Sequence, residues 1–203
     1  MVFPLHFTCP FVLASASPRR RALLDQLQIE FSVQVSPADE TLDGPRSPVS
    51  MVRDLATRKA TPVSRQNPAA LVLAADTVVA HDGDVLEKPT SPSHAHRMLR
   101  RLSGTTHEVH TGFALHHADS DRQAAQVCST AVSFASLSDQ EIDAYVETRS
   151  PMDKAGGYGI QDHTAPLFVE GLSGDYYTVV GLPLHALYAC LKSDFADLIR
   201  APT

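Results

Sequence analysis

Tryptophan is absent from this sequence of 203 residues, and no run of apolar residues approaches the roughly 20 residues that span a bilayer. Cysteine is scarce: Cys9, Cys128 and Cys190 are widely separated and form no CxxC pair. This usage excludes a disulfide framework and a zinc site, and it favours reduced thiols in the cytoplasm. The histidine pairs at 94 and 96 and at 116 and 117 lack the spacing of a helical zinc pair, and we expect them at the surface.

An excess of positive charge is missing as well. The chain has 17 Lys and Arg against 23 Asp and Glu, for a formal net charge of −6. Proteins that bind nucleic acid polymers usually carry a basic surface, so we expect no such partner. The first residues, MVFPLHFTCPFVLA, carry no positively charged region, so we expect neither a signal peptide nor a membrane partner. The nucleotide motifs GxGxxG and GxxxxGK followed by Ser or Thr are also absent, which argues against the common nucleotide-binding folds.

Strand-like and helix-like segments interleave along the chain. The strands are predicted over residues 10–14, 31–37, 70–80, 106–117 and 124–135, with a hairpin turn at 82–83 and a further hairpin over 167–180. Helices are predicted to begin at the Ser-Pro pairs 17–18, 47–48 and 91–92, at the capping box 138–141, and within 181–191. This order predicts an α/β fold with a mixed β-sheet flanked by helices.

Three arginines stand where a predicted helix begins, in the stretch ASASPRRRALLDQL over residues 14–27. The positive end of a helix dipole should repel them. On a period of 3.6 residues, Arg19 and Arg20 extend the leucine stripe that faces the core, whereas Arg21 is one turn from Asp25 and forms a surface ion pair. Two guanidinium groups beside the free N–H groups of a helix N-terminus favour a polyanion such as phosphate.

Asp76 interrupts the apolar run ALVLAADTVVA, where an unpaired carboxylate is strongly disfavoured. One interpretation is structural: the carboxylate caps a nearby backbone turn. The other is functional: a carboxylate at a strand end binds a metal ion or activates water. Its neighbour Thr77 is either a β-favouring residue or a hydroxyl ligand for the same bound group.

Other polar residues acquire a role only in combination. Glu40 in an acidic loop, Lys59 at the end of a helical stripe and Lys88 before a proline are each typical of a solvated surface. Together they would supply cations for phosphate oxygens and a second carboxylate for a divalent ion. The segment KAGGYGIQ, over residues 154–161, is either a plain turn or a permissive backbone that presents the Gln161 amide to a base edge.

Six blocks occur in the order LASASPRRRALLDQL, LAADTVV, LEKP, MLRRLSGTTHEVHTG, DKAGGYGIQ and VVGLPL. Together they resemble the Maf family of nucleoside triphosphate pyrophosphatases, from about Phe11 to Leu191. The resemblance implies a single domain over residues 1–203, with residues 1–10 as an N-terminal extension that carries no matching motif. It also implies a fold related to that of the inosine triphosphate pyrophosphatases: an elongated mixed sheet and two lobes with a nucleotide cleft.

The reaction implied by the resemblance is hydrolysis of a nucleoside triphosphate to its monophosphate and pyrophosphate with a divalent cation, Mg²⁺ or Mn²⁺. By motif, Asp76 is the proton acceptor, and Glu40 and Asp76 together hold the metal. Catalysis also involves Arg20 and Lys88, which stabilise charge on the phosphates. The residues that match substrate-binding positions are Ser15, Arg19, Arg20, Lys59, Thr77, Lys88 and Gln161.

The late glycine block resembles the branch of the family that acts on dTTP and UTP. The nearest alternative is the same chemistry on 7-methyl-GTP or another modified nucleotide. An alternative of another class is a non-catalytic nucleotide-binding regulator of cell division. The two further carboxylates near Asp76, Glu40 and Glu87, favour the enzyme, because a sensor needs cations more than a metal site. A symmetric homodimer is expected from the frequency of twofold oligomers.

Overall fold

The computed structural model describes residues 5–41, 44 and 46–200. The chain divides into two compact units. The first unit comprises Met1–Asp76, Thr111–Cys128 and Gly181–Thr203, and the second comprises Thr77–His110 and Ser129–Val180. Within the described part of the chain, no helix combines the length and the apolar character that a membrane span requires.

Seven strands form one sheet. They are β2 (Phe11–Leu13), β3 (Ser32–Val33), β4 (Leu71–His81), β5 (Asp84–Leu86), β6 (Thr106–His117), β7 (Arg122–Phe134) and β8 (Val169–Ser173). Their order is β3-β2-β4-β6-β7-β8, and β5 pairs with β4. β2 is parallel to β3 and β4, whereas β5 is antiparallel to β4 and β8 is antiparallel to β7. The predicted mixed sheet is therefore confirmed, and the boundary between the two units falls inside β4, β6 and β7.

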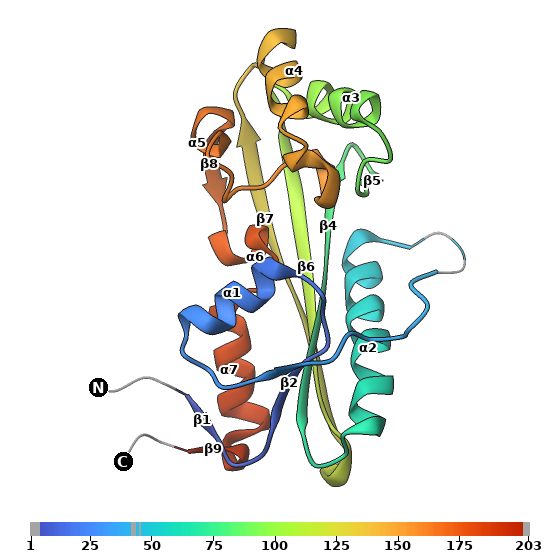
Figure 1. Cartoon of the computed structure of the whole chain (residues 1–203), viewed down its shortest axis with the longest axis vertical. Helices are drawn as coiled ribbons and strands as arrows, with labels where there is room; N and C mark the ends of the chain where they lie inside the picture. Colours follow the sequence, from blue (N-terminus) through green and yellow to red (C-terminus); the bar gives the residue numbers. More distant parts are fainter. Residues whose placement is uncertain (1–4, 42–43, 45, 201–203) are drawn as a thin grey trace. The chain divides into compact units, whose positions relative to one another are not determined.

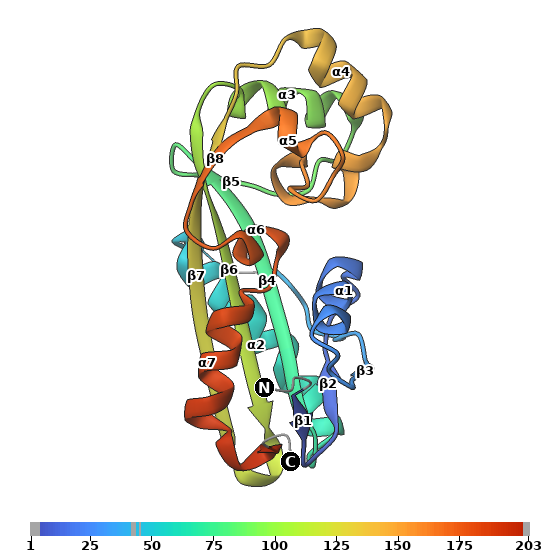
Figure 2. The ribbon, with the colours of Figure 1, turned by 90° about the vertical axis from the view of Figure 1, so that its left-hand side faces the viewer.

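The first unit has helices on both faces of its strands. α1 (Pro18–Gln26) and α7 (Leu184–Asp194) lie on one face, and α2 (Pro48–Gln66) lies on the other (Figures 1 and 2). The Ser-Pro starts are confirmed: the hydroxyl oxygens of Ser17 and Ser47 accept hydrogen bonds from the backbone N–H three residues on, and proline occupies the first helical position. The ends of the unit join through an antiparallel pair, β1 (His6–Phe7) with β9 (Ile199–Arg200), and two 3₁₀ turns complete it, η1 (Ala118–Ser120) and η4 (Ala196–Leu198).

A glycine allows α2 to approach β6 closely. A Cβ atom at Gly112 would lie 2.5 Å from the carbonyl oxygen of Val52 in α2. The apolar face of α2, with Ala56, Ala60 and Val63, packs against Val72 and other buried residues of the sheet. Small side chains at the contact allow the helix backbone to lie close to the strands, and this sets the position of every side chain that α2 carries.

The second unit packs helices around an aromatic core. Its helices are α3 (Pro92–Leu102), α4 (Asp139–Glu147), α5 (Ala165–Phe168) and α6 (Tyr176–Val180), with 3₁₀ turns η2 (Ser150–Asp153) and η3 (Ala155–Gly157). The capping box is confirmed, because the side chains of Ser138 and Glu141 each accept a hydrogen bond from the other's backbone N–H. The turn between β4 and β5 is also confirmed: Asp82 and Gly83 have φ of 50° and 83°, as a tight hairpin requires.

Three of the predicted strands differ from the structure. The predicted second strand of the hairpin, residues 176–180, is the helix α6, and residues 165–168 form α5 before β8 begins. At α6, Asp175 overrides the β-favouring side chains because its carboxylate accepts hydrogen bonds from the backbone N–H (2.8 Å) and the hydroxyl (3.0 Å) of Thr178. The predicted strand over 31–37 shortens to two residues.

The expectation of surface positions was wrong for two histidines. His116 and His117 are buried at the end of β6, a strand with neighbours on both sides in the sheet. An imidazole ring is apolar enough to be covered in its neutral form, and burial lowers the pKa of His116. His94 and His96 are half-buried on α3.

His107 is the most unusual polar residue of the second core. It is 2% exposed, its Nε2 lies 2.8 Å from the Tyr158 hydroxyl, and its ring packs edge-on against Phe134. Its Nδ1 has no hydrogen-bond partner among the described residues. Burial lowers the pKa of His107 to about 4, because the charged imidazolium would be poorly solvated there.

We expect Gly112→Ala to lower the free energy of unfolding by about 1–3 kcal/mol, because the added methyl group overlaps the Val52 carbonyl and must push α2 away. Gly171→Ala is the matched control, since nothing lies within 4 Å of the added Cβ at that strand position. Thermal unfolding of both variants measures the difference. Equal melting temperatures for the two variants would contradict the close helix–strand contact.

We expect His107 to make the protein less stable as the pH falls from about 6.5 towards 4. In this range the unfolded state binds a proton at this position and the folded state does not, so stability rises with pH. The slope from this group is at most about 1.4 kcal/mol per pH unit. Denaturant unfolding at a series of pH values should show a shallower slope for His107→Gln, which keeps a polar partner for Tyr158. An unchanged slope would show that His107 titrates normally.

Candidate active site

The first unit brings together six of the residues selected from the sequence. Ser15 lies in the turn after β2, Arg19 and Arg20 begin α1, and Glu40 lies in the loop before α2. Lys59 comes from the middle of α2, and Asp76 lies near the middle of β4. They come from separate segments of the chain, so only the fold can make them neighbours.

Arg20 is fixed by two acceptors. Its Nε donates to the carbonyl oxygen of Gly181 at 2.8 Å, and its Nη1 donates to the hydroxyl oxygen of Ser15 at 3.1 Å. The same Ser15 hydroxyl accepts the backbone N–H of Ser17 at 3.2 Å, which holds the turn before α1. These contacts orient the guanidinium group at the start of the helix.

The electrostatic environment of Arg20 combines burial with charges of both signs. Burial lowers the pKa of its guanidinium below the usual value, the negative charges of Asp76 and Glu40 act in the opposite direction, and Arg19 lowers it further. Arginine keeps its proton throughout the range that proteins experience. Arg20 is therefore a permanent positive charge that interacts electrostatically with both candidate metal-binding carboxylates, Asp76 and Glu40.

Lys59 lies between two carboxylates. Its Nζ is 2.6 Å from Oδ1 of Asp76 and 2.7 Å from Oε2 of Glu40. The side chains of Lys59 and Asp76 are only 13% and 14% exposed, whereas that of Glu40 is 63% exposed. Lys59 thus points to the acidic pair and not to solvent, and the Asp76 carboxylate pairs with a lysine and does not cap a turn. Asp76 lies in the middle of β4 and not at the strand end that the functional interpretation assumed.

The two carboxylates fit a divalent cation that also binds phosphate. Both converge on one cationic atom, and both offer only oxygen ligands, which Mg²⁺ and Mn²⁺ prefer. Mg²⁺ is commonly held by one or two carboxylates while the substrate's phosphates and water complete its coordination. Within the described residues no group of three or more His, Cys, Asp or Glu side chains could hold a metal by itself.

The remaining predicted residues belong to the second unit. Thr77 is half-buried in β4, Lys88 is exposed two residues after β5, and Gln161 is exposed in the glycine-rich segment. The backbone N–H of Gly156 donates to the carbonyl oxygen of Glu87 at 3.2 Å. This hydrogen bond joins the segment that carries Lys88 to the segment that carries Gln161.

Sequence reasoning missed Gly181. The block VVGLPL contributed to the resemblance without a role for any residue, yet the Gly181 carbonyl anchors Arg20. Gly181 has a φ of 119°, which side chains with a Cβ rarely adopt. A glycine between two apolar pairs was the signal available, but nothing local points to an arginine 161 residues away.

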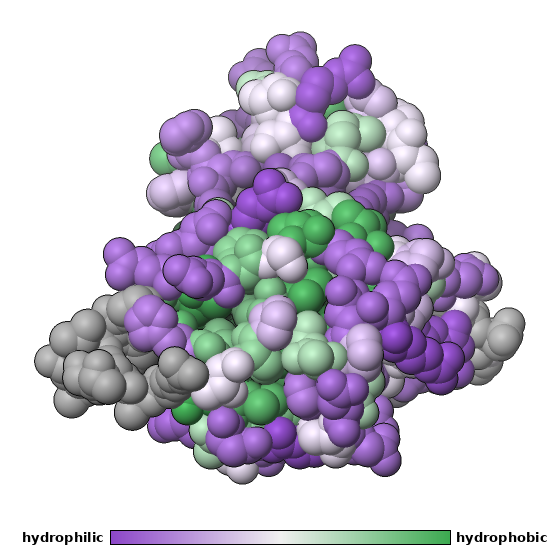
Figure 3. All heavy atoms as spheres, turned by 60° about the horizontal axis from the view of Figure 1, so that its bottom comes forward, coloured by the Kyte–Doolittle hydropathy of each residue, from purple (hydrophilic) through white to green (hydrophobic). Residues whose placement is uncertain are grey.

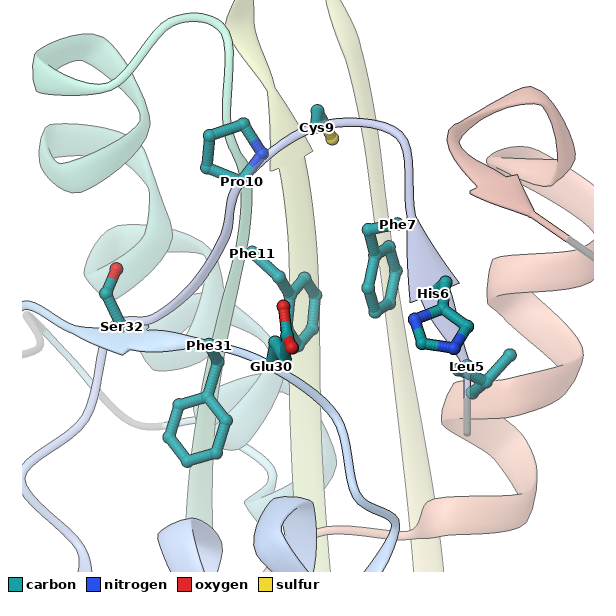
Figure 4. Close-up of a pocket in the computed structure, with 9 residues that line it drawn as sticks. All are labelled: Leu5, His6, Phe7, Cys9, Pro10, Phe11, Glu30, Phe31 and Ser32. Carbon is teal, nitrogen blue, oxygen red and sulfur yellow. The ribbon is translucent and has the colours of Figure 1, made fainter. Parts of the chain in front are cut away.

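A hollow of about 320 Å³ lies elsewhere in the first unit, beside β1 and β2 (Figure 4). Its lining includes the rings of Phe7, Phe11 and Phe31 and the carboxylate of Glu30, and none of the residues selected from the sequence. Phe7 and Phe11 stack with ring centroids 4.4 Å apart, which packs the N-terminal extension onto the sheet. Hydrophobic residues gather in the middle of the face drawn in Figure 3.

Comparison with known proteins finds a family profile and several similar proteins. The sequence profile described as "Maf-like protein" matches residues 10–194. The chain is 61% identical over 197 residues to a dTTP/UTP pyrophosphatase of Salinibacter ruber, and the match covers 97% of each chain. It is 52% identical over 174 residues to a dTTP/UTP pyrophosphatase of Symbiobacterium thermophilum, covering 86% of this chain and 88% of the relative. A solved structure of a HAM1 protein from Coxiella burnetii covers 78% of this chain and 91% of its own, with a TM-score of 0.43 and 19% identity.

We expect Arg20→Lys to destabilise the fold by about 1–3 kcal/mol although it keeps the charge. A lysine cannot donate to both the Gly181 carbonyl and the Ser15 hydroxyl in the geometry of the guanidinium group. Arg21→Lys, on the exposed side of the same helix, is the control. Denaturant unfolding measures both, and a loss no larger than that of the control would show that the two hydrogen bonds contribute little.

Proposed function

Because this chain belongs to the Maf-like protein family, we propose that it is a nucleoside triphosphate pyrophosphatase that hydrolyses dTTP and UTP to the nucleoside monophosphate and pyrophosphate. The observation that carries the proposal is the arrangement in which Lys59 contacts both Asp76 and Glu40 while Arg20 senses the same two charges. Such a mixed set of cations and carboxylates suits a triphosphate that arrives with a divalent metal.

Asp76 is the group proposed to accept a proton from the attacking water. It is the less exposed of the two carboxylates, and Lys59 holds it in place from the neighbouring helix. A divalent ion bound by Asp76 and Glu40 would neutralise part of the charge on the phosphates. Oδ1 of Asp76 pairs with Lys59, and Oδ2 is the oxygen proposed to accept the proton.

The cations are proposed to bind the phosphate oxygens. Arg20 is already oriented by Gly181 and Ser15, so little side-chain entropy is lost when it binds an anion. Arg19, Lys59 and Lys88 supply further donors, and Thr77 and Gln161 are assigned to recognition of the base. Preorganised donors of this kind stabilise the charge that develops on the phosphates during the reaction.

The cysteines agree with a reducing compartment. Cys9 and Cys190 are free thiols, and Cys190 is buried. Burial, strengthened by the nearby Asp194, raises the pKa of the Cys190 thiol to about 12, so it stays protonated and unreactive. We therefore propose that the enzyme acts in the cytoplasm.

We expect the purified chain with MgCl₂ or MnCl₂ to release pyrophosphate from dTTP and UTP, and to do so more slowly from CTP, GTP and 7-methyl-GTP. Asp76→Asn should lower kcat by roughly 10²- to 10⁴-fold, the usual contribution of a general base, while dTTP still binds. A coupled pyrophosphate assay measures turnover, and calorimetry measures binding. Asp82→Asn is the control, because asparagine suits the same turn position as well as aspartate does.

Three outcomes would contradict parts of this proposal. Binding of dTTP without turnover by the unmodified chain would indicate a nucleotide-binding regulator. Turnover confined to 7-methyl-GTP would move the chain to the other branch of substrates. A near-normal rate for Asp76→Asn would show that another group activates water.

A further inference from the structure

Gln161 occupies the corner of a tight turn. The backbone N–H of Asp162 donates to the carbonyl oxygen of Gly159 at 3.0 Å, which closes a four-residue turn with Ile160 and Gln161 at its centre. The Gln161 side chain is exposed, so it is presented outward by the turn and is not held by packing. The contacts that hold Gly159 and Asp162 therefore hold the backbone that carries the Gln161 side chain.

One hydroxyl group holds both ends. The backbone N–H of Gly159 donates to the Tyr145 oxygen at 3.2 Å, and the Tyr145 hydroxyl donates to Oδ2 of Asp162. Tyr145 comes from α4 and is only 3% exposed, and its ring packs edge-on against Phe168 with centroids 5.2 Å apart. The Tyr145 ring is thus packed in the core, and its hydroxyl group contacts both ends of the turn that carries Gln161.

The carboxylate at the far end of the turn has further partners. The Ser150 hydroxyl donates to Oδ2 of Asp162 at 2.6 Å, and Nζ of Lys154 lies 3.7 Å from the same oxygen. Lys154 also donates to the Ser150 carbonyl oxygen at 2.6 Å. Lys154 pairs more closely with Asp153, at 2.8 Å. The position of Asp162 is therefore set mainly by the hydroxyl groups of Tyr145 and Ser150, which come from different segments of the second unit.

The remaining space around the turn is filled. A Cβ atom at Gly159 would lie 2.5 Å from Cε of Lys154 and 2.8 Å from Oδ1 of Asp162. An added methyl group would have to displace the end of the lysine side chain or the Asp162 carboxylate. Glycine at this position therefore keeps the turn in close contact with both side chains.

The hydroxyl of Tyr145 has a structural task and not a catalytic one. Burial and the neighbouring Asp162 carboxylate raise its pKa far above neutral, so it stays protonated. Its proton is committed to Asp162 and its lone pair accepts the Gly159 N–H. It is a positioning residue that acts through the turn.

The direction of the Gln161 amide matters for choosing a base. Uracil and thymine present a carbonyl acceptor at position 4, whereas cytosine presents an amino donor there. An amide group carries a donor on one side and an acceptor on the other, so its orientation decides which pyrimidine it matches. A turn with a fixed backbone limits the positions from which this amide can reach the base.

We propose that Tyr145 determines the preference for uracil and thymine over cytosine, by holding Gly159 and Asp162 and thereby the turn that presents Gln161. This inference rests on the proposed function, in which Gln161 recognises the base of a pyrimidine nucleoside triphosphate.

The test is steady-state hydrolysis of UTP, dTTP and CTP by Tyr145→Phe, which removes one oxygen atom and keeps the ring. KM for UTP and dTTP should rise about ten-fold, as expected when one hydrogen-bonded contact is lost, while kcat stays within about three-fold, since the phosphate-binding groups are untouched. The ratio of kcat/KM for UTP to that for CTP should fall about ten-fold. Tyr176→Phe, an exposed tyrosine of the same unit, is the matched control and should leave all three quantities unchanged.

A second variant keeps the inference testable if Tyr145→Phe folds poorly by circular dichroism. Asp162→Ala removes the other partner of the same hydrogen bond and should reduce the UTP to CTP ratio by a similar factor. The double variant should lose little more than either single variant, because residues acting through one contact are not additive.

Failure of the proposed function and failure of the positioning role of Tyr145 give different results. If the unmodified chain does not hydrolyse UTP or dTTP, the proposed function is wrong. If it does, and the folded Tyr145→Phe and Asp162→Ala variants keep the UTP to CTP ratio within two-fold of the unmodified chain, or lose kcat equally on all three nucleotides, the positioning role of Tyr145 is refuted.

Discussion

The contact of Lys59 with Asp76 is the interaction on which the first unit depends. A carboxylate in the middle of an apolar strand is tolerated only with a partner charge, because removing either charge leaves the other buried and unpaired. The partner arrives from α2, so the helix must lie close to the sheet, and Gly112 provides the space for it. The packing of α2 and the charge pair therefore stabilise each other: the apolar contact positions Lys59, and the ion pair makes Asp76 acceptable in β4.

The three arginines at the start of α1 have separate explanations. The helix dipole opposes cations at this end, and Arg20 overcomes this through two acceptors that only the folded chain supplies, the Gly181 carbonyl and the Ser15 hydroxyl. The negative charges of Asp76 and Glu40 add a favourable field at the same place. Arg20 is thus held by its surroundings before any anion is bound, whereas Arg21 lies on the exposed side of the helix.

Much of this could be predicted from the sequence where the signal is local. Serine caps followed by proline, the capping box at Ser138 and the Asp82–Gly83 turn each depend on neighbours within four residues, and the structure has all of them. Partners distant in sequence could not be predicted. Gly181, Tyr145 and the burial of His116 follow from strand order and helix packing, and the helical turn of α6 follows from Asp175 overriding β-favouring side chains. The sequence pattern identified candidate site residues. Tertiary contacts determine which of their side chains are held in a defined orientation.

The proposed roles of the two units, phosphate binding for the first and base recognition for the second, follow from the side chains that each unit carries. The first unit carries Arg19, Arg20, Lys59, Asp76 and Glu40, whose full charges are the groups proposed to attract a metal-bound triphosphate whatever its base. Discrimination between bases requires groups that present a donor or an acceptor in a defined direction, and an amide carries one of each. In the proposed function Gln161 supplies this amide. In the network around it, Nζ of Lys154 lies 2.8 Å from Asp153 and 3.7 Å from Asp162. A turn held in this way can change its base preference through small substitutions that leave the charged cluster, and hence the phosphate chemistry, intact.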